Sequence, residues 1–105
     1  MIKIQKKDFN IEKEINYIKS KHSKIGAIST FIGYVRNTNN RKKVTSINLE
    51  VYDKMAFKLL DDLSIKAKKK WRIIDSLIIH RYGKILVNQK IVLVATFSMH
   101  RSDSF

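Results

Sequence analysis

The order of helical and strand-like patterns along the chain limits its possible folds more than any other feature of the sequence. Apolar residues recur first with helical spacing, then with strand-like alternation in two segments, then with helical spacing again, and finally in three short β-type runs. The expected helices are residues 8–21 and 53–70, and the expected strands are residues 24–36, 44–52, 73–80, 84–86 and 91–99. This order predicts an α+β domain with a mainly antiparallel sheet and two main helices.

The second expected helix carries the clearest apolar stripe. Met55, Leu59, Leu63 and Ala67 recur every fourth residue, which is the spacing that places side chains on one helix face. We therefore expect this stripe to be part of the core. The single tryptophan, Trp71, directly follows the helix and is expected to plug the core beside it.

Length and composition predict one domain, residues 1–105, without covalent or metal staples. A chain of 105 residues is long enough for one core and too short for two. The absence of cysteine excludes disulfides, thiolate metal sites and cysteine nucleophiles. The three histidines show no metal-ligand spacing, so we expect no metal site, and His22, in a lysine-rich segment, is expected to have no chemical role. Phosphate-loop, dinucleotide-binding and nucleophile-elbow glycine motifs are also absent.

The N-terminal segment and the apolar runs predict a soluble protein of the cytoplasm. The first residues include lysines, but the apolar stretch of a secretory signal does not follow them. The longest apolar run, near residues 91–99, is about half as long as a membrane-spanning helix requires. We therefore expect no membrane partner.

An excess of positive charge is the most unusual property of the composition. The chain has 22 lysine and arginine residues against 9 aspartate and glutamate residues, which gives a formal net charge of +13. Such a charge attracts anions, namely nucleic acid, phosphate-bearing metabolites or an acidic protein. It equally fits a chain whose lysines only keep the surface hydrated, so the net charge by itself leaves these alternatives open.

Positively charged residues stand at the ends of two expected strands. Arg36 ends the first strand, and His100 and Arg101 follow the last one. If the two strands are neighbours, their ends can meet at one rim of the sheet. Guanidinium groups hold phosphate or carboxylate oxygens in pairs, and a histidine beside them can exchange a proton near neutral pH. The pattern predicts an anion receptor, and the alternative is a set of solvated strand ends.

A second histidine–arginine pair, His80 and Arg81, precedes an expected turn. We expect this pair to be structural, with an ion pair to Glu50 or Asp75. Glu50 and Tyr52 share one face of their strand; a general base is conceivable there, and a salt bridge with a basic neighbour is favoured.

Five segments, taken in order, resemble a known protein family. They read GAISTFIGYVRN, LEVYDKMA, KKKWRI, IIHRYGKI and HRSDSF, and they extend from Gly26 to Phe105. Their residues and their order resemble the large, catalytic subunit of molybdopterin synthase. The resemblance implies an α/β-hammerhead-type fold and a homodimer at the centre of a heterotetramer.

The resemblance also implies an activity and its partners. Each outer subunit is a small ubiquitin-like protein whose C-terminal Gly-Gly carries a thiocarboxylate. Its tail delivers sulfur to cyclic pyranopterin monophosphate, which gives molybdopterin in molybdenum cofactor biosynthesis, and no separate cofactor is implied. The family's substrate-contacting positions fall on Tyr34, Val35, Arg36, His100 and Arg101. The last two are expected to reach across the dimer.

The chain departs from the family pattern in three places, the first of which is Ser104 in place of the usual alanine. Residues 87–89, VNQ, stand where the family tends to have Gly-Glu. The family also continues with a helix and a segment that bears the lysines credited with sulfur transfer; these would lie beyond Phe105, so the catalytic residues are unassigned. Neither Lys84 nor Lys90 has a context that marks it as a substitute.

The helix with which the family continues would cover one face of the sheet, so its absence affects the expected stability. Without it, the apolar run 91–97 is expected to lie uncovered, which predicts weak stability or self-association.

The alternative function, supported by net charge alone, is a small basic binding module for nucleic acid or an acidic protein partner.

Overall fold

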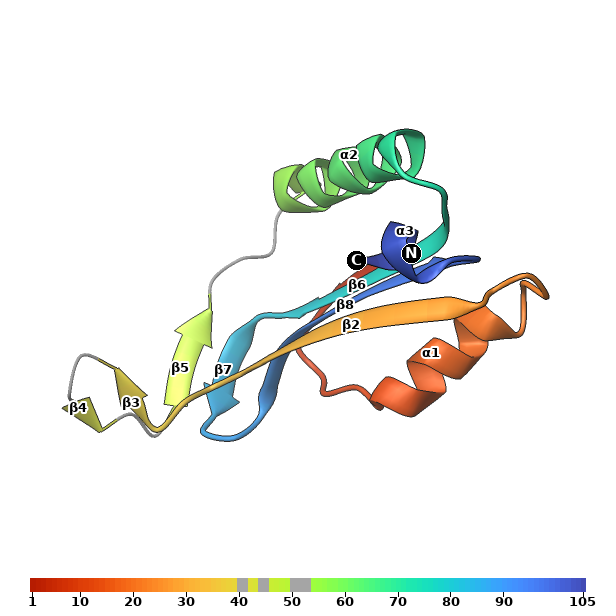
Figure 1. Ribbon diagram of the computed structural model, residues 1–105. Coiled ribbons are helices and arrows are strands. Elements are labelled where there is room, and N and C mark those ends of the chain that lie inside the picture. Colours follow the sequence, from red (N-terminus) through yellow and green to blue (C-terminus); the bar gives the residue numbers. More distant parts are fainter. Residues whose placement is uncertain (40–41, 44–45, 50–53) are drawn as a thin grey trace.

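A four-stranded sheet with a longer helix on each face forms the body of the molecule (Figure 1). The structure is a computed structural model that describes residues 1–39, 42–43, 46–49 and 54–105. Its elements in chain order are β1 (Ile2–Gln5), α1 (Ile11–Lys19), β2 (Ala27–Tyr34), β3 (Thr38–Asn39), β4 (Lys42–Lys43), β5 (Ser46–Leu49), α2 (Lys54–Lys70), β6 (Ile73–Arg81), β7 (Gly83–Leu86), β8 (Lys90–Ser98) and α3 (Arg101–Ser104).

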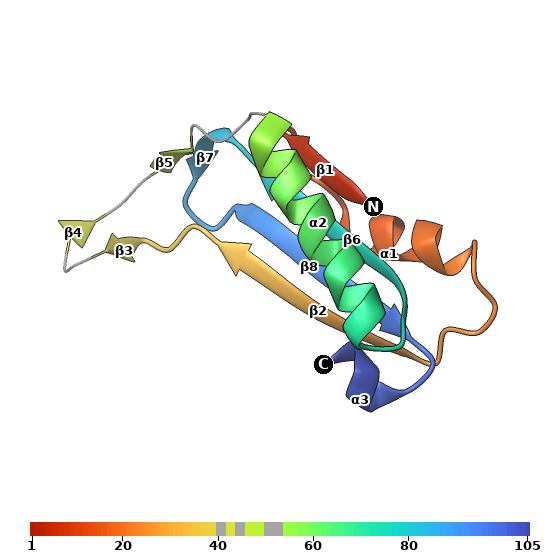
Figure 2. The same cartoon turned by 90° about the horizontal axis from the view of Figure 1, so that it is seen from above.

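The strands of the main sheet are ordered β1, β6, β8, β2, as Figure 2 shows from above. β8 runs antiparallel to both β6 and β2, whereas β1 runs parallel to β6. The short strands also pair in antiparallel fashion, β3 with β4 and β5 with β7. The predicted α+β class with a mainly antiparallel sheet is therefore confirmed. β1 was not predicted, because its four residues carry only two apolar side chains and offer little periodicity to detect.

The last strand, β8, lies at the centre of the sheet. Its residues Leu93, Ala95 and Phe97 are fully buried. The prediction that the run 91–97 would lie uncovered is wrong for this face, because β6 and β2 satisfy the backbone of β8 on both sides and α1 covers the side chains. A central strand has no unpaired edge to expose.

The face of the sheet that packs against α1 holds the core. Asn10 begins this helix, and its side-chain oxygen accepts a hydrogen bond from the backbone N–H of Lys13 at 3.0 Å, which satisfies one of the free donors of the first turn. The buried cluster comprises Phe9, Ile18, Leu77, Ile79, Leu93, Ala95 and Phe97. Alternate residues of β6 and β8 enter it, as the two-residue period of a strand requires.

The other face of the sheet is covered by α2, which lies against β6 and β1 (Figure 2). Leu59 is 61% exposed and Leu63 is 51% exposed, so the prediction that their stripe is core is wrong for these two residues. Among the side chains of the helix that the structure describes, Leu60, Ser64 and Ala67 are half-buried. Ala67 belongs to the predicted stripe, and the other two each lie one residue after an exposed leucine. Helical spacing identifies an apolar face but does not say which neighbour covers it. The side chain of Met55 lies outside the described residues.

Trp71 does not plug the core either. Its side chain is 47% exposed, and Lys70 lies over its ring with Nζ at 4.8 Å from the centroid. The residue stands in the short connection between α2 and β6, and this connection runs along the surface. The prediction of a buried tryptophan is therefore wrong.

The short helix α3 fixes the C-terminal residues against the sheet on its α2 side. Ser104 Oγ lies 3.2 Å from Ser29 Oγ of β2, and the Ser104 carbonyl accepts a hydrogen bond from Thr96 Oγ1 of β8. Ser98 Oγ donates to the His100 carbonyl at 2.5 Å. These contacts tie α3 to two neighbouring strands.

A charged cluster around Asp75 joins the segment after α1 to α2 and β6. His22 Nε2 lies 2.9 Å from Asp75 Oδ2, and Lys68 Nζ lies 3.7 Å from Asp75 Oδ1. Burial raises the pKa of Asp75, but the hydrogen bonds from His22 and from the Ser76 N–H, together with the charge of Lys68, outweigh it, and the pKa lies below the ordinary value of 3.8. His22, which was expected to have no role, is thus a structural residue.

Two leucine substitutions test which faces are buried in solution. Leu93→Ala should lower the free energy of unfolding by about 2–5 kcal/mol, because it leaves a cavity in the core. Leu59→Ala, the same change at an exposed site, should lower it by less than about 0.5 kcal/mol. Urea unfolding measures both values. Equal losses would contradict the exposed placement of Leu59.

A second test concerns the ionised carboxylate of Asp75. Its pKa is lowered in the folded state, so its contribution is present above the unfolded-state value of 3.8 and is lost as the pH falls through the lower folded-state value. Asp75→Asn should lower the free energy of unfolding by about 1–2 kcal/mol at pH near 7, and the difference from wild type should shrink below pH 3.8. Urea unfolding between these pH values measures it, with the exposed Asp62→Asn as the control. A difference that does not change with pH would contradict the role of the charge.

Candidate anion-binding site

The first group of predicted site residues leaves the sheet at the end of β2. Tyr34 is its last residue and is half exposed. Val35 follows and is only 3% exposed, and Arg36 is exposed. A buried valine between two exposed residues anchors this segment and turns the arginine toward solvent.

The second group, His100 and Arg101, lies at the opposite end of the sheet. In the antiparallel register Ala27 faces Ser98, whereas Tyr34 faces Lys90. The two ends are thus separated by seven residue steps, or roughly 23 Å. The prediction that the two strand ends meet at one rim is wrong within a single chain, because neighbouring antiparallel strands finish at opposite edges (Figure 2). The sequence left open both whether the two strands are neighbours and in which direction they run.

The second group is itself well exposed. His100 occupies the N-cap position of α3 without a side-chain capping bond, and its side chain is exposed. The Arg101 guanidinium lies 5.2 Å from the ring centroid of Phe105, a cation–π geometry. In the described part of the chain, neither Arg36 nor Arg101 forms an ion pair with a carboxylate. Both guanidinium groups are therefore available to an external anion.

The other histidine–arginine pair is structural, as predicted. Arg81 is buried, and its guanidinium donates from Nε to the Lys6 carbonyl at 3.1 Å and from Nη1 to the Lys90 carbonyl at 2.9 Å. His80 Nδ1 lies 2.8 Å from the Arg81 carbonyl oxygen. Arg81 does have a carboxylate neighbour, but it is Asp8, whose Oδ1 lies 4.0 Å from Nη1, and not Asp75, which pairs with His22 and Lys68. Glu50, the other predicted partner, lies outside the described residues, as does Tyr52.

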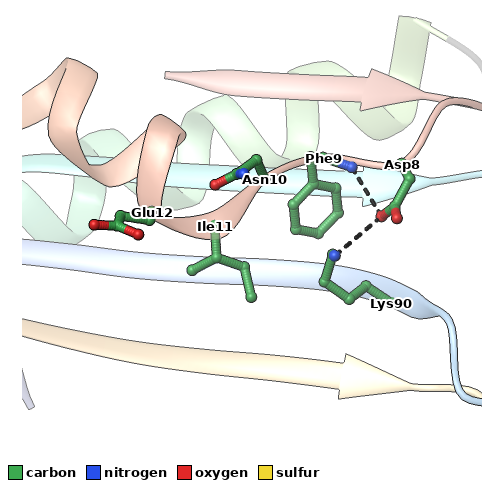
Figure 3. A pocket seen from close by; sticks show the side chains of 6 residues that line it. All are labelled: Asp8, Phe9, Asn10, Ile11, Glu12 and Lys90. Carbon is green, nitrogen blue, oxygen red and sulfur yellow. Dashed lines mark hydrogen bonds and ion pairs between the residues drawn. The ribbon is translucent and has the colours of Figure 1, made fainter.

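A shallow depression near the start of α1 does not suit an anion. Its lining residues, drawn in Figure 3, are Asp8, Phe9, Asn10, Ile11, Glu12 and Lys90. Lys90 Nζ lies 3.3 Å from Asp8 Oδ1 and 5.3 Å from the ring centroid of Phe9. Burial raises the pKa of Asp8, but the Phe9 N–H and the nearby Lys90 and Arg81 charges bring it below its ordinary value of 3.8. Lys90, the one cation among these lining residues, is thus already paired with the Asp8 carboxylate, and Glu12 adds a second acidic group.

The described residues contain no recognisable metal centre. No three histidine, aspartate or glutamate side chains come together there in a way that could hold an ion. In the same part of the chain, no helix is both long and apolar enough to cross a membrane.

Curated relatives match nearly the whole chain. The molybdopterin synthase catalytic subunit of Ralstonia nicotianae is 39% identical over 104 residues, which are 99% of this chain and 59% of the relative. The protein of the same name from Pyrococcus abyssi is 38% identical over 98 residues, or 93% of this chain and 65% of the relative. The chain thus spans less than two thirds of the length of these two relatives.

Solved structures agree with the fold. The molybdopterin biosynthesis MoaE protein from Burkholderia ambifaria has a TM-score of 0.90 and 37% identity over 100% of this chain and 68% of that one. Molybdopterin synthase from Staphylococcus aureus has a TM-score of 0.86 and 27% identity over 97% of this chain and 73% of that one. A complex of subunits 1 and 2 of molybdopterin-converting factor from Helicobacter pylori has a TM-score of 0.79 and, at 18% identity, supports the fold alone.

These comparisons confirm the resemblance that the five sequence segments predicted. The family model described as MoaE protein matches residues 4–105. The structural agreement extends over all of the chain in the Burkholderia protein. The chain therefore belongs to the MoaE family.

Proposed function

We propose that this chain is the large subunit of a molybdopterin synthase, acting in molybdenum cofactor biosynthesis in the cytoplasm. The observation that carries the proposal is the match to the family over residues 4–105, together with relatives named as catalytic subunits of that enzyme. In this reaction sulfur passes from the thiocarboxylate of a small ubiquitin-like subunit to cyclic pyranopterin monophosphate.

The two exposed arginines suit the reactants of this transfer. The cyclic phosphate of the pterin and the thiocarboxylate of the carrier tail are both anions. A guanidinium group offers a planar set of donors that holds two oxygens of such an anion at once. We therefore assign Arg36 and Arg101, with His100 beside the latter, to anion binding, and Tyr34 and Val35 to the wall of the same site.

One site built from both groups requires two chains. Because Arg36 and Arg101 lie at opposite ends of the sheet, a single chain offers two half-sites. A two-fold symmetric dimer places the first half-site of one chain beside the second half-site of its partner, and it does so twice. We propose this homodimer as the functional core, with one small subunit at each shared site. The Helicobacter pylori protein that shares this fold is itself part of a complex of subunits 1 and 2 of molybdopterin-converting factor.

The residues that carry out the sulfur transfer are not assigned within positions 1–105. The resemblance places the family's lysines beyond Phe105. What the described residues supply is binding and orientation of two anions, which brings the reacting atoms together and reduces the entropy lost in the reaction.

The alternative of a basic module for nucleic acid or an acidic partner rests on the net charge of +13 alone. Retention of DNA or RNA at low salt, with affinity falling steeply as salt rises, would favour it. Binding of the pterin without such retention would favour the synthase.

Arginine substitutions test the shared site. Arg36→Ala and Arg101→Ala should each weaken binding of cyclic pyranopterin monophosphate about tenfold to a hundredfold, because each removes a charge-assisted contact. Titration calorimetry measures the affinity. Lys13→Ala, which removes an exposed charge from α1, is the matched control and should bind as the wild type does.

Mixing the two variants tests whether the site spans two chains. In a dimer of one Arg36→Ala chain and one Arg101→Ala chain, one of the two sites keeps both arginines. Random re-association should therefore restore wild-type affinity at about a quarter of the sites. No restoration in a mixture shown to form mixed dimers would contradict the shared site, and unchanged binding by both single variants would overturn the assignment of the arginines.

A further inference from the structure

We infer that the turn between β7 and β8 positions Arg36 for its anion, and that Asn88 is the positioning residue within it. The inference rests on the proposed function, because it concerns the same site. Asn88 lies at the tip of the turn and is far from Arg36 in sequence, so no motif connects them. The backbone contacts of Val35 connect them instead.

Val35 is held from both sides by two adjacent residues of the turn. Its N–H donates to the Gln89 carbonyl at 3.0 Å, and its own carbonyl accepts from the Asn88 N–H at 2.9 Å. Its side chain is buried. The residue before Arg36 is therefore fixed through both of its peptide groups, and the arginine begins from a defined position.

The turn that holds Val35 is itself closed by two hydrogen bonds. The Gln89 N–H donates to the Leu86 carbonyl at 3.1 Å, and the Leu86 N–H donates to the Gln89 side-chain oxygen at 3.1 Å. Asn88 has a φ of 67°, the one positive value among the non-glycine residues that the structure describes. Asparagine and glycine adopt this left-handed conformation far more readily than other residues. The conformation of Asn88 thus sets the direction of the N–H that reaches Val35.

A β-bulge lies directly beside this contact. Gly33 faces Val92 and Tyr34 faces Lys90, so Ile91 is an extra residue on β8. A bulge bends its strand and changes the direction of the residues that follow. A Cβ atom on Gly33 would lie 2.9 Å from Val92 Cγ1, so any larger residue there would have to displace the Val92 side chain. The bulge and the turn together determine how the segment 34–36 leaves the sheet.

Fixing the backbone in this way has a specific benefit for an exposed arginine. A guanidinium on a mobile segment loses backbone as well as side-chain freedom when an anion binds. A segment that is already ordered loses only side-chain freedom, so more of the contact energy appears as affinity. The turn therefore acts on binding through Arg36 and does not touch the ligand.

Three substitutions separate this role from a general effect on stability. Asn88→Val should weaken binding of cyclic pyranopterin monophosphate about tenfold, because a β-branched residue resists the left-handed conformation. Asn88→Ala should have a smaller effect in the same direction, and Asn88→Gly should bind as the wild type does, because glycine adopts the conformation freely. Gly83→Ala is the matched control: Gly83, the first residue of β7, also has a positive φ, +83°, and an added Cβ would meet only the Lys6 side chain, at 3.7 Å. It strains the backbone similarly but should leave the affinity unchanged.

The coupling between Asn88 and Arg36 provides the decisive measurement. In an Arg36→Ala background, Asn88→Val should cause no further loss of affinity, because its effect passes through the arginine. Hydrogen exchange of the Val35 amide should be faster in Asn88→Val and unchanged in Gly83→Ala. The inference is overturned if Asn88→Val binds as well as Gly83→Ala does, or if it weakens binding equally with and without Arg36. Both it and the assignment of Arg36 to anion binding are overturned if Arg36→Ala alone binds as the wild type does, whereas the family match that carries the proposed function is unaffected by that result.

Discussion

The antiparallel pairing of β8 with β2 and β6 is the constraint on which the rest of the structure depends. It places β8 at the centre of the sheet and sends Leu93, Ala95 and Phe97 into the core. The same pairing separates the two cationic strand ends by the length of a strand. The stability of the chain and the layout of its candidate site therefore have one origin, and no rearrangement of surface side chains could bring Arg36 to Arg101 within one chain.

Buried polar groups hold the edges of this sheet. The Arg81 guanidinium links the carbonyl of Lys6, which follows β1, to the carbonyl of Lys90 at the start of β8. A buried charge is costly unless its donors are satisfied, and here backbone oxygens and the nearby Asp8, whose Oδ1 lies 4.0 Å from Nη1, meet that need. At the other end of β6, Asp75 makes a comparable junction with His22 and Lys68. The first junction ties one end of β6 to β8 and to the segment after β1, and the second ties the other end to α2 and to the segment after α1.

The sequence allowed most elements to be predicted but not how they are arranged. Periodicity identified both long helices, three of the four strands of the main sheet and the shorter strands β5 and β7, because each has enough apolar residues to show its period. It missed β1, whose four residues are too few to show a period. It also assigned Leu59 and Leu63 to the core, because a helical stripe reveals an apolar face without its neighbour.

The candidate site shows the same limit more sharply. Arg36, His100 and Arg101 were found from their places at strand ends and from the family resemblance, yet their expected meeting within one chain was wrong because strand direction does not appear in a local pattern. Arg81 was recognised as structural, but its partners are the carboxylate of Asp8 and two backbone carbonyls, and no sequence pattern marks the carbonyls. Asn88 could have been suspected only from the tolerance of asparagine for turns.

The strand order also governs how the protein is made. β2 pairs with β8 and β1 pairs with β6, so the main partners are separated by most of the chain. During translation, β1 and β2 leave the ribosome long before their neighbours exist. Contacts between distant residues form slowly, because closing the intervening loop costs entropy before the contact is made. The apolar faces of α1 and β2 therefore stay exposed to solvent until residues 90–98 are synthesised. Of the strands that the structure describes, β8 is synthesised last. Only the β1–β6 pair of the main sheet can form before it.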